Sequence, residues 1–91
     1  MSAYVYMIRC QDSSLYTGWT TDLAARLKKH ASGKGAKYTR TFTAVELVYF
    51  EEVADKSAAL KREYALKQLK KESKEALVSA MNNELLQKLL L

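Results

Sequence analysis

A carboxylate in an apolar setting is the first feature of this 91-residue sequence that could do chemistry. On a helix that turns by about 100° per residue, an apolar arc is formed by Ala59, Leu60 and Leu66. Glu63 falls inside that arc, and a carboxylate facing a core is costly unless it is paired or holds a metal. Two interpretations stay open. Glu63 is a ligand for a hard cation, or it is a structural group that pairs with an arginine such as Arg26 or reaches water at a rim.

A second candidate is the pair Arg26 and His30, which share one side of a helix because they are four residues apart. They flank an apolar stripe formed by Leu23 and Leu27. An arginine suits a phosphate because it carries a permanent charge on a bidentate fork. A histidine beside it could transfer a proton. The alternative for His30 is a helix C-cap or an ordinary surface position.

Tyr6 and Tyr16 lie on the two strands of a predicted hairpin. If the loop has an odd number of residues, such as 11–13, both rings lie on one face as diagonal neighbours, and if it is even they point to opposite faces. A tyrosine whose pKa is lowered by neighbouring cations could take a proton from water. The alternative is that both rings only pack in the core or at its rim.

Basic residues are clustered. The chain has a net charge of +5 and a pI of about 9.4, and residues 26–40 carry six cations and no acid. These six are Arg26, Lys28, Lys29, Lys34, Lys37 and Arg40, and a second run holds Lys67, Lys70, Lys71 and Lys74. Clustered cations suit a polyanion such as nucleic acid, although solvated helix surfaces also show them. Tyr38 lies among the first group and could stack on a base or pack locally.

Three strands and three helices are predicted to position these groups. The strands cover 3–10, 15–20 and 44–52, and the helices follow caps at Thr21, Asp55 and Ser73 and reach about 32, 71 and 81. The order β-β-α-β-α-α predicts an α+β domain with a three-stranded, mainly antiparallel sheet flanked by helices. Strand 3–10 is apolar on both faces, so we expect it in the centre of the sheet.

Composition excludes several classes of protein. We expect one domain over 1–91, because the length fits no more. No apolar run approaches the roughly 18 residues of a membrane span, and the N-terminus has no secretory pattern, so a cytoplasmic protein is expected. One cysteine and one histidine exclude an internal disulfide and a zinc site of the multi-Cys/His type. A short apolar helix or tail over 84–91 could cap the core or, if exposed, bind a partner.

Taken together, these positions make the chain similar to the GIY-YIG nucleases. The resemblance covers about residues 3–70, with 73–91 as a helical extension. Its first half-motif is Val5-Tyr6, preceded by Tyr4 where the family has Gly, and its second is Tyr16-Thr17-Gly18, with Thr17 in place of Ile. The two tyrosines have the usual family separation, and Gly18 allows the backbone to be approached closely.

Three further positions match the family in order. Arg26 stands at the position of the helix arginine, His30 at a position where the family often has His or Tyr, and Glu63 at that of the metal-binding glutamate. The length and the Ser-Gly-Lys-Gly loop resemble small stand-alone bacterial members of the family. We expect no attached DNA-recognition domain, which leaves the target open.

The resemblance implies a metal-dependent endonuclease that hydrolyses phosphodiester bonds in DNA, with RNA as the alternative substrate and a role in repair or processing. Glu63 would hold Mg²⁺ or Mn²⁺, Arg26 would bind the phosphate, Tyr6 or Tyr16 would activate water, and His30 would relay or orient. The sugar-phosphate backbone of the nucleic acid would lie along a basic surface. Its residues would be Lys28, Lys29, Lys34, Lys37, Tyr38 and Arg40. No membrane and no small-molecule cofactor are expected. The alternative is a nucleic-acid-binding module of the same fold without significant cleavage.

Overall fold

A three-stranded antiparallel sheet forms the middle layer of the computed structural model, which describes residues 2–32 and 44–81. Its strands are β1 (Ala3–Cys10), β2 (Leu15–Thr20) and β3 (Ala44–Val53). The order is β2-β1-β3, so β1 lies in the centre and pairs antiparallel with both neighbours. The predicted fold class and the central position of the first strand are confirmed.

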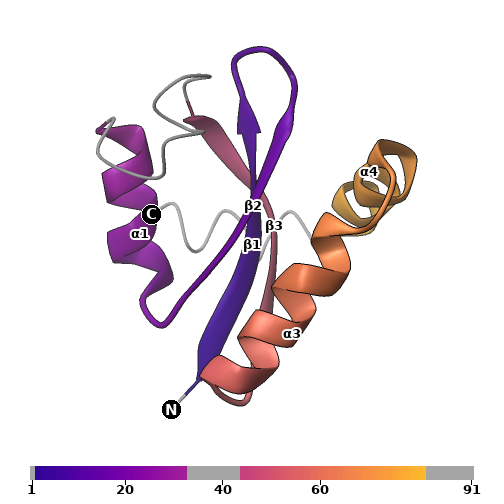
Figure 1. The fold of residues 1–91 in the computed structure, drawn as a ribbon. Coiled ribbons are helices and arrows are strands. Elements are labelled where there is room, and N and C mark those ends of the chain that lie inside the picture. The colour runs from indigo at the N-terminus through magenta and orange to yellow at the C-terminus, as the bar shows by residue number, and fades with distance from the viewer. Residues whose placement is uncertain (1, 33–43, 82–91) are drawn as a thin grey trace.

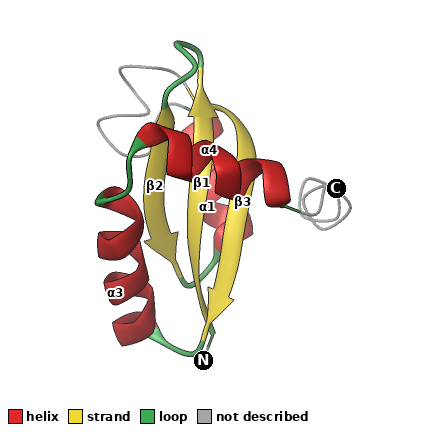
Figure 2. Ribbon diagram, turned by 90° about the vertical axis from the view of Figure 1, so that its right-hand side faces the viewer, coloured by secondary structure: helices red, strands yellow, loops and turns green. Residues whose placement is uncertain are grey.

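Helices cover both faces of the sheet. They are α1 (Leu23–Ala31), α3 (Lys56–Lys67) and α4 (Lys71–Ala80). Figure 2 shows α3 and α4 on one face and α1 behind the other, while Figure 1 looks along the β2 edge, with α1 on the left and α3 on the right. Each face carries its own apolar cluster, and β1 contributes to both because its residues alternate between the faces.

The β1–β2 hairpin closes with an odd, three-residue loop. The Ser13 amide donates to the Cys10 carbonyl and the Cys10 amide donates to the Ser14 carbonyl, both over 2.9 Å. Ser13 has φ 71°, the left-handed conformation that such a loop needs at its last position. Because the loop is odd, the pairs Tyr6↔Gly18 and Ile8↔Tyr16 put both tyrosines on one face, as one of the two alternatives predicted.

Two of the three predicted helix caps are wrong. Asp22, not Thr21, caps α1: its carboxylate accepts from the Ala25 amide over 3.1 Å, and its own amide donates to Thr20. Ser73 lies inside the first turn of α4, whose N-cap is Lys70. At α1 both Thr21 and Asp22 have cap chemistry, and the path of the chain selects Asp22. At α4 the helix begins before Ser73, and its N-cap Lys70 makes no side-chain capping hydrogen bond.

Asp55 does cap α3, accepting from the Ala58 amide over 2.9 Å. The helix then ends at Lys67 rather than near Lys71. The chain has to turn at this point, because Leu77 and Val78 of α4 pack against the same cluster as Leu66 of α3. Tertiary packing therefore divides a basic stretch that helix propensity alone would continue.

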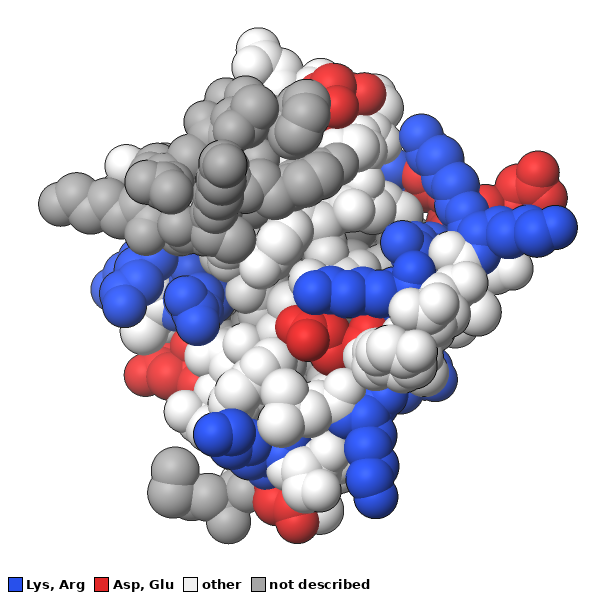
Figure 3. Space-filling model, in the orientation of Figure 1, with Lys and Arg blue, Asp and Glu red and all other residues white. Residues whose placement is uncertain are grey.

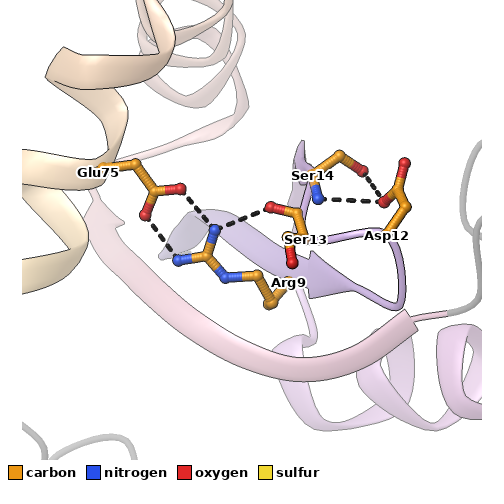
Figure 4. Close-up of polar contacts among 5 residues, drawn as sticks. All are labelled: Arg9, Asp12, Ser13, Ser14 and Glu75. Atoms are coloured by element: carbon orange, nitrogen blue, oxygen red, sulfur yellow. Dashed lines mark hydrogen bonds and ion pairs between the residues drawn. The ribbon is translucent and has the colours of Figure 1, made fainter.

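An ion pair fastens α4 to the hairpin (Figure 4). The Arg9 guanidinium donates to both oxygens of Glu75 over 2.5 and 2.6 Å, and also to the Ser13 carbonyl over 3.0 Å. The hydrogen bonds from Arg9 hold the pKa of Glu75 below its usual range. Beside them, Asp12 accepts from the Ser14 amide and hydroxyl and keeps the loop closed. The first hairpin and the last described helix thus form one unit.

The extension predicted over 73–91 is described only up to Met81, where α4 has ended. The tail over 84–91 lies outside the described residues, so its role in the core or with a partner stays a prediction. None of the helices in 2–32 and 44–81 is long and apolar enough to cross a membrane. The single-domain boundaries and the cytoplasmic location also stay predictions.

Candidate active site

Three rings meet on the α1 side of the sheet. A hydrogen bond of 2.8 Å joins Tyr6 Oη on β1 to His30 Nε2 on α1. The Tyr16 ring lies 5.3 Å from the His30 ring and 6.3 Å from the Tyr6 ring, between centroids. Tyr6 and His30 are 1% and 3% exposed, whereas Tyr16 is only partly buried. Tyr6 is therefore a core residue with a polar end inside the site, and Tyr16 forms the side that solvent can reach.

Gly18 makes room for this cluster. It faces Tyr6 across the hairpin, and a Cβ there would lie 2.7 Å from Tyr6 Oη and 3.0 Å from Tyr16 Cε2. Such distances are too short for carbon, so the backbone of β2 must stay bare for both rings to fit. The close approach predicted for Gly18 is thus made by side chains of the site itself.

Helix α1 supplies Arg26 and His30. His30 is neither the C-cap, which is Ser32, nor a surface residue, so the ordinary alternatives for it are wrong. Arg26 is partly buried and lines a surface hollow with Thr20, Asp22, Ala25 and Lys29. Its guanidinium makes no hydrogen bond or ion pair with any described residue, which leaves its donors available to a ligand.

Glu63 belongs to α3, on the other side of the β2 edge. Ala59 and Leu66 are fully buried and define the inward direction of the helix, and at about 100° per residue Glu63 lies about 50° to one side of it. The prediction that Leu60 belongs to the apolar arc is wrong, because Leu60 is 43% exposed. The Glu63 side chain is 19% exposed and lies 3.8 Å from the Lys67 ammonium. The predicted alternative of a pair with Arg26 is not formed, and the rim position is the one observed.

The charges of α1 and α3 meet at the tyrosines. Burial raises the pKa of Tyr16, and the Glu63 carboxylate raises it further while Arg26 lowers it. Burial also raises the pKa of Tyr6, with smaller effects from Tyr16, Arg26 and Glu63. The expectation of a lowered tyrosine pKa is therefore wrong for the metal-free protein, because burial and a nearby carboxylate outweigh one arginine. Burial and Arg26 lower the pKa of His30, so its imidazole is neutral near pH 7.

Comparison with known proteins agrees with this arrangement. Residues 2–76 match the profile of the GIY-YIG catalytic domain. The chain belongs to the GIY-YIG family. Members of this family are endonucleases, so membership supports a nuclease-type function.

Relatives of similar size are found in bacteria and archaea. A UPF0213 protein of Haloquadratum walsbyi is 51% identical over 74 residues, which is 81% of this chain and 83% of that protein. A UPF0213 protein of Clostridium perfringens is 51% identical over 77 residues, covering 85% and 83%. The names of these GIY-YIG relatives state no substrate and no activity.

Two solved structures share the GIY-YIG fold of this chain. The solution NMR structure of a UPF0213 protein from Bacillus halodurans is 51% identical, has a TM-score of 0.56, and covers 87% of this chain and 84% of its own. That of a protein from E. faecalis is 39% identical, with a TM-score of 0.58 and the same coverage.

Basic side chains gather on both sides of the GIY-YIG site. Figure 3 shows them over α1 on the left and over α3 and α4 on the right, with an acidic group between. Lys28 and Lys29 are exposed on α1, as a role in DNA binding requires. Lys34, Lys37, Tyr38 and Arg40 lie outside the described residues. The cations of α3 and α4 include members of the second basic run of the sequence, Lys67, Lys71 and Lys74, which had not been assigned to the site.

Proposed function

We propose that this protein is a metal-dependent endonuclease that hydrolyses phosphodiester bonds in DNA. The observation that carries the proposal is the convergence of five side chains from four elements: Tyr6, Tyr16, Arg26, His30 and Glu63. Two of them approach from α1 and one from α3, across the edge of β2. A phosphate at this edge would meet a cation, a proton acceptor and a carboxylate together.

Arg26 is proposed to bind the scissile phosphate. Its guanidinium has no partner among the described residues, and it borders a hollow open to solvent. Two parallel N–H donors match two non-bridging oxygens, and their charge opposes the negative charge that develops as water attacks. Burial, and to a smaller extent Arg26, lower the pKa of His30, which favours its neutral imidazole.

Tyr16 is the better candidate for the base that activates water. Tyr6 is 1% exposed and held by His30, whereas Tyr16 is open to solvent on one side. Tyr16 would act as a phenolate, whose own proton has left to the solvent that it faces. It would take a proton from the attacking water as the water oxygen bonds to phosphorus and the bond to the 3′ oxygen breaks, and the released 3′ oxyanion would take a proton from solvent. Tyr6 and His30 would orient the Tyr16 ring through their ring contacts.

Glu63 fits a divalent cation of the Mg²⁺ or Mn²⁺ type. It is partly buried, its ion pair to Lys67 is long, and the described residues hold no group of three possible ligands. Mg²⁺ commonly keeps several waters and takes one or two carboxylates with substrate phosphates, so one glutamate suffices, whereas a zinc cage would not fit. Bound there, the cation would stabilise charge on the leaving oxygen and cancel the effect of Glu63 on the tyrosine pKa values.

The test is cleavage of labelled single-stranded, duplex and branched DNAs with Mg²⁺ or Mn²⁺. We expect Arg26→Ala to lower the rate by about 10²–10³-fold, the cost of losing one donor to a developing oxyanion. Glu63→Gln should abolish the response to metal. Matched controls are Lys61→Ala and Glu72→Gln, which are exposed on α3 and α4. Equal cutting by all five proteins would mean a contaminating nuclease and would defeat the proposal.

One alternative has its own support. The tyrosine pKa values are raised and Lys67 already pairs with Glu63, features that also suit a nucleic-acid-binding module without significant cleavage. Binding to every DNA in the panel, with no cutting in either metal, would favour that function over the endonuclease.

A further inference from the structure

A second hollow borders the candidate site on the side opposite α1. It is lined by Leu15, Tyr16 and Thr17 of β2, by Lys67 of α3 and by Lys74 of α4. We propose that this hollow binds a backbone phosphate of the nucleic acid, the one next to the phosphate held at Arg26 and Glu63. The inference rests on the proposed function and extends it, because it gives the strand a path across the site.

Lys67 is the link between the hollow and the site. Its ammonium lies 3.8 Å from the Glu63 carboxylate, and its side chain is 50% exposed. An ion pair this long and this open is weak, so a phosphate can replace the carboxylate as its partner at little cost. A cation bound by Glu63 would repel the ammonium and turn it toward the hollow.

Lys74 faces Lys67 from the next helix. It lies in the first turns of α4, where the helix dipole adds positive potential, and it has no ion pair with any described residue. Because α4 is fixed to the hairpin by Arg9 and Glu75, its distance from β2 is set by the fold. Two ammonium groups around one hollow, with no acid among its lining residues, select an anion.

Tyr16 lines the hollow and also belongs to the ring cluster, so the two places are neighbours. Figure 3 shows the same arrangement from outside, with basic side chains over α1 and over α3 and α4 on either side of the edge of β2. A strand whose scissile phosphate lies at this edge has to leave it in two directions. One direction leads over Arg26 and Lys29, and the other leads over Lys67 and Lys74.

The test measures binding without cleavage. Fluorescence anisotropy with a labelled DNA oligonucleotide in EDTA, repeated over a range of salt concentrations, gives the slope of log affinity against log salt. Lys67→Gln/Lys74→Gln is compared with Lys56→Gln/Lys61→Gln, which removes the same charge from α3 at positions that do not line the hollow. Circular dichroism checks that both variants are folded.

We expect the variant of the hollow, Lys67→Gln/Lys74→Gln, to lose about one unit of the slope of log affinity against log salt for each lysine that contacts a phosphate. The control should keep the wild-type slope. Equal loss in both variants would mean general surface charge and would overturn the inference, as would an unchanged slope in the hollow variant. Because the assay contains no metal, its result is independent of turnover. Wild-type protein that binds with the expected slopes but never cuts would defeat the endonuclease proposal alone.

Discussion

Replacing Gly18 with alanine tests whether the tyrosine cluster depends on a bare backbone. Gly→Ala at an ordinary strand position stabilises a protein by about 0.5–1 kcal/mol, because the unfolded chain loses freedom. Here the new Cβ would meet Tyr6 Oη at 2.7 Å and Tyr6 Cζ at 2.8 Å. Tyr6 is 1% exposed and hydrogen-bonded to His30, so its ring cannot move aside freely.

Overpacking of this kind costs about 1–3 kcal/mol, which exceeds the entropic gain. We therefore expect Gly18→Ala to lower the free energy of unfolding by about 1 kcal/mol, the difference between the midpoints of the two ranges. Urea unfolding at constant m-value would measure it. The hydrogen bond from Tyr6 to His30 should also weaken, which NMR titration of the His30 ring would show as a changed pKa.

A double-mutant cycle identifies the cause. Tyr6→Leu removes the two nearest atoms that the new Cβ would strike and leaves only Tyr16 Cε2 at 3.0 Å, so in that background Gly18→Ala should cost clearly less stability. A Gly18→Ala protein as stable as wild type, or the same loss in both backgrounds, would refute the packing argument.

Three other outcomes are expected. Thr17→Val should raise the free energy of unfolding by about 1 kcal/mol, because the buried Thr17 hydroxyl has no hydrogen-bond partner among the described residues; a loss of stability in urea would contradict this. His30 has a lowered pKa, so the unfolded chain binds its proton first, and stability should fall as pH drops below about 6.5 toward the folded pKa; His30→Gln should remove that part of the pH dependence in urea titrations. Arg9→Ala should cost on the order of 1 kcal/mol and speed amide exchange in α4, and a double-mutant cycle with Glu75→Ala should show coupling that decreases in high salt.

Local sequence patterns were sufficient to predict the strands and one of the helix caps. Aromatic and β-branched residues predicted the strand over 3–10, the turn after it predicted the return strand over 15–20, and the apolar character of both faces of 3–10 predicted its central place. Asp55 could be recognised as a cap from its type and position alone. These features depend on interactions within a few residues, which a single sequence contains in full.

The caps at Thr21 and Ser73 and the inward position of Leu60 were wrong for one reason. Local residue type favoured each of them, but where a helix begins and which side it buries are set by the direction in which the chain must continue to bury its core; at α4 this places the N-cap at Lys70, whose side chain makes no capping hydrogen bond. The prediction of a lowered tyrosine pKa was wrong for a related reason. Burial raises the pKa of both tyrosines, and how far each ring is buried depends on which other elements cover it.

The sequence by itself determined which residue types are available for chemistry: two tyrosines, an arginine, a histidine and a glutamate, spread from Tyr6 to Glu63. Only the tertiary structure decided that Tyr6 bonds to His30, that Gly18 gives both rings their space, and that Lys67 and Lys74 face one hollow. Spacing along a chain fixes neighbours within an element, whereas contacts between elements depend on the loop length, register and crossing of the whole sheet.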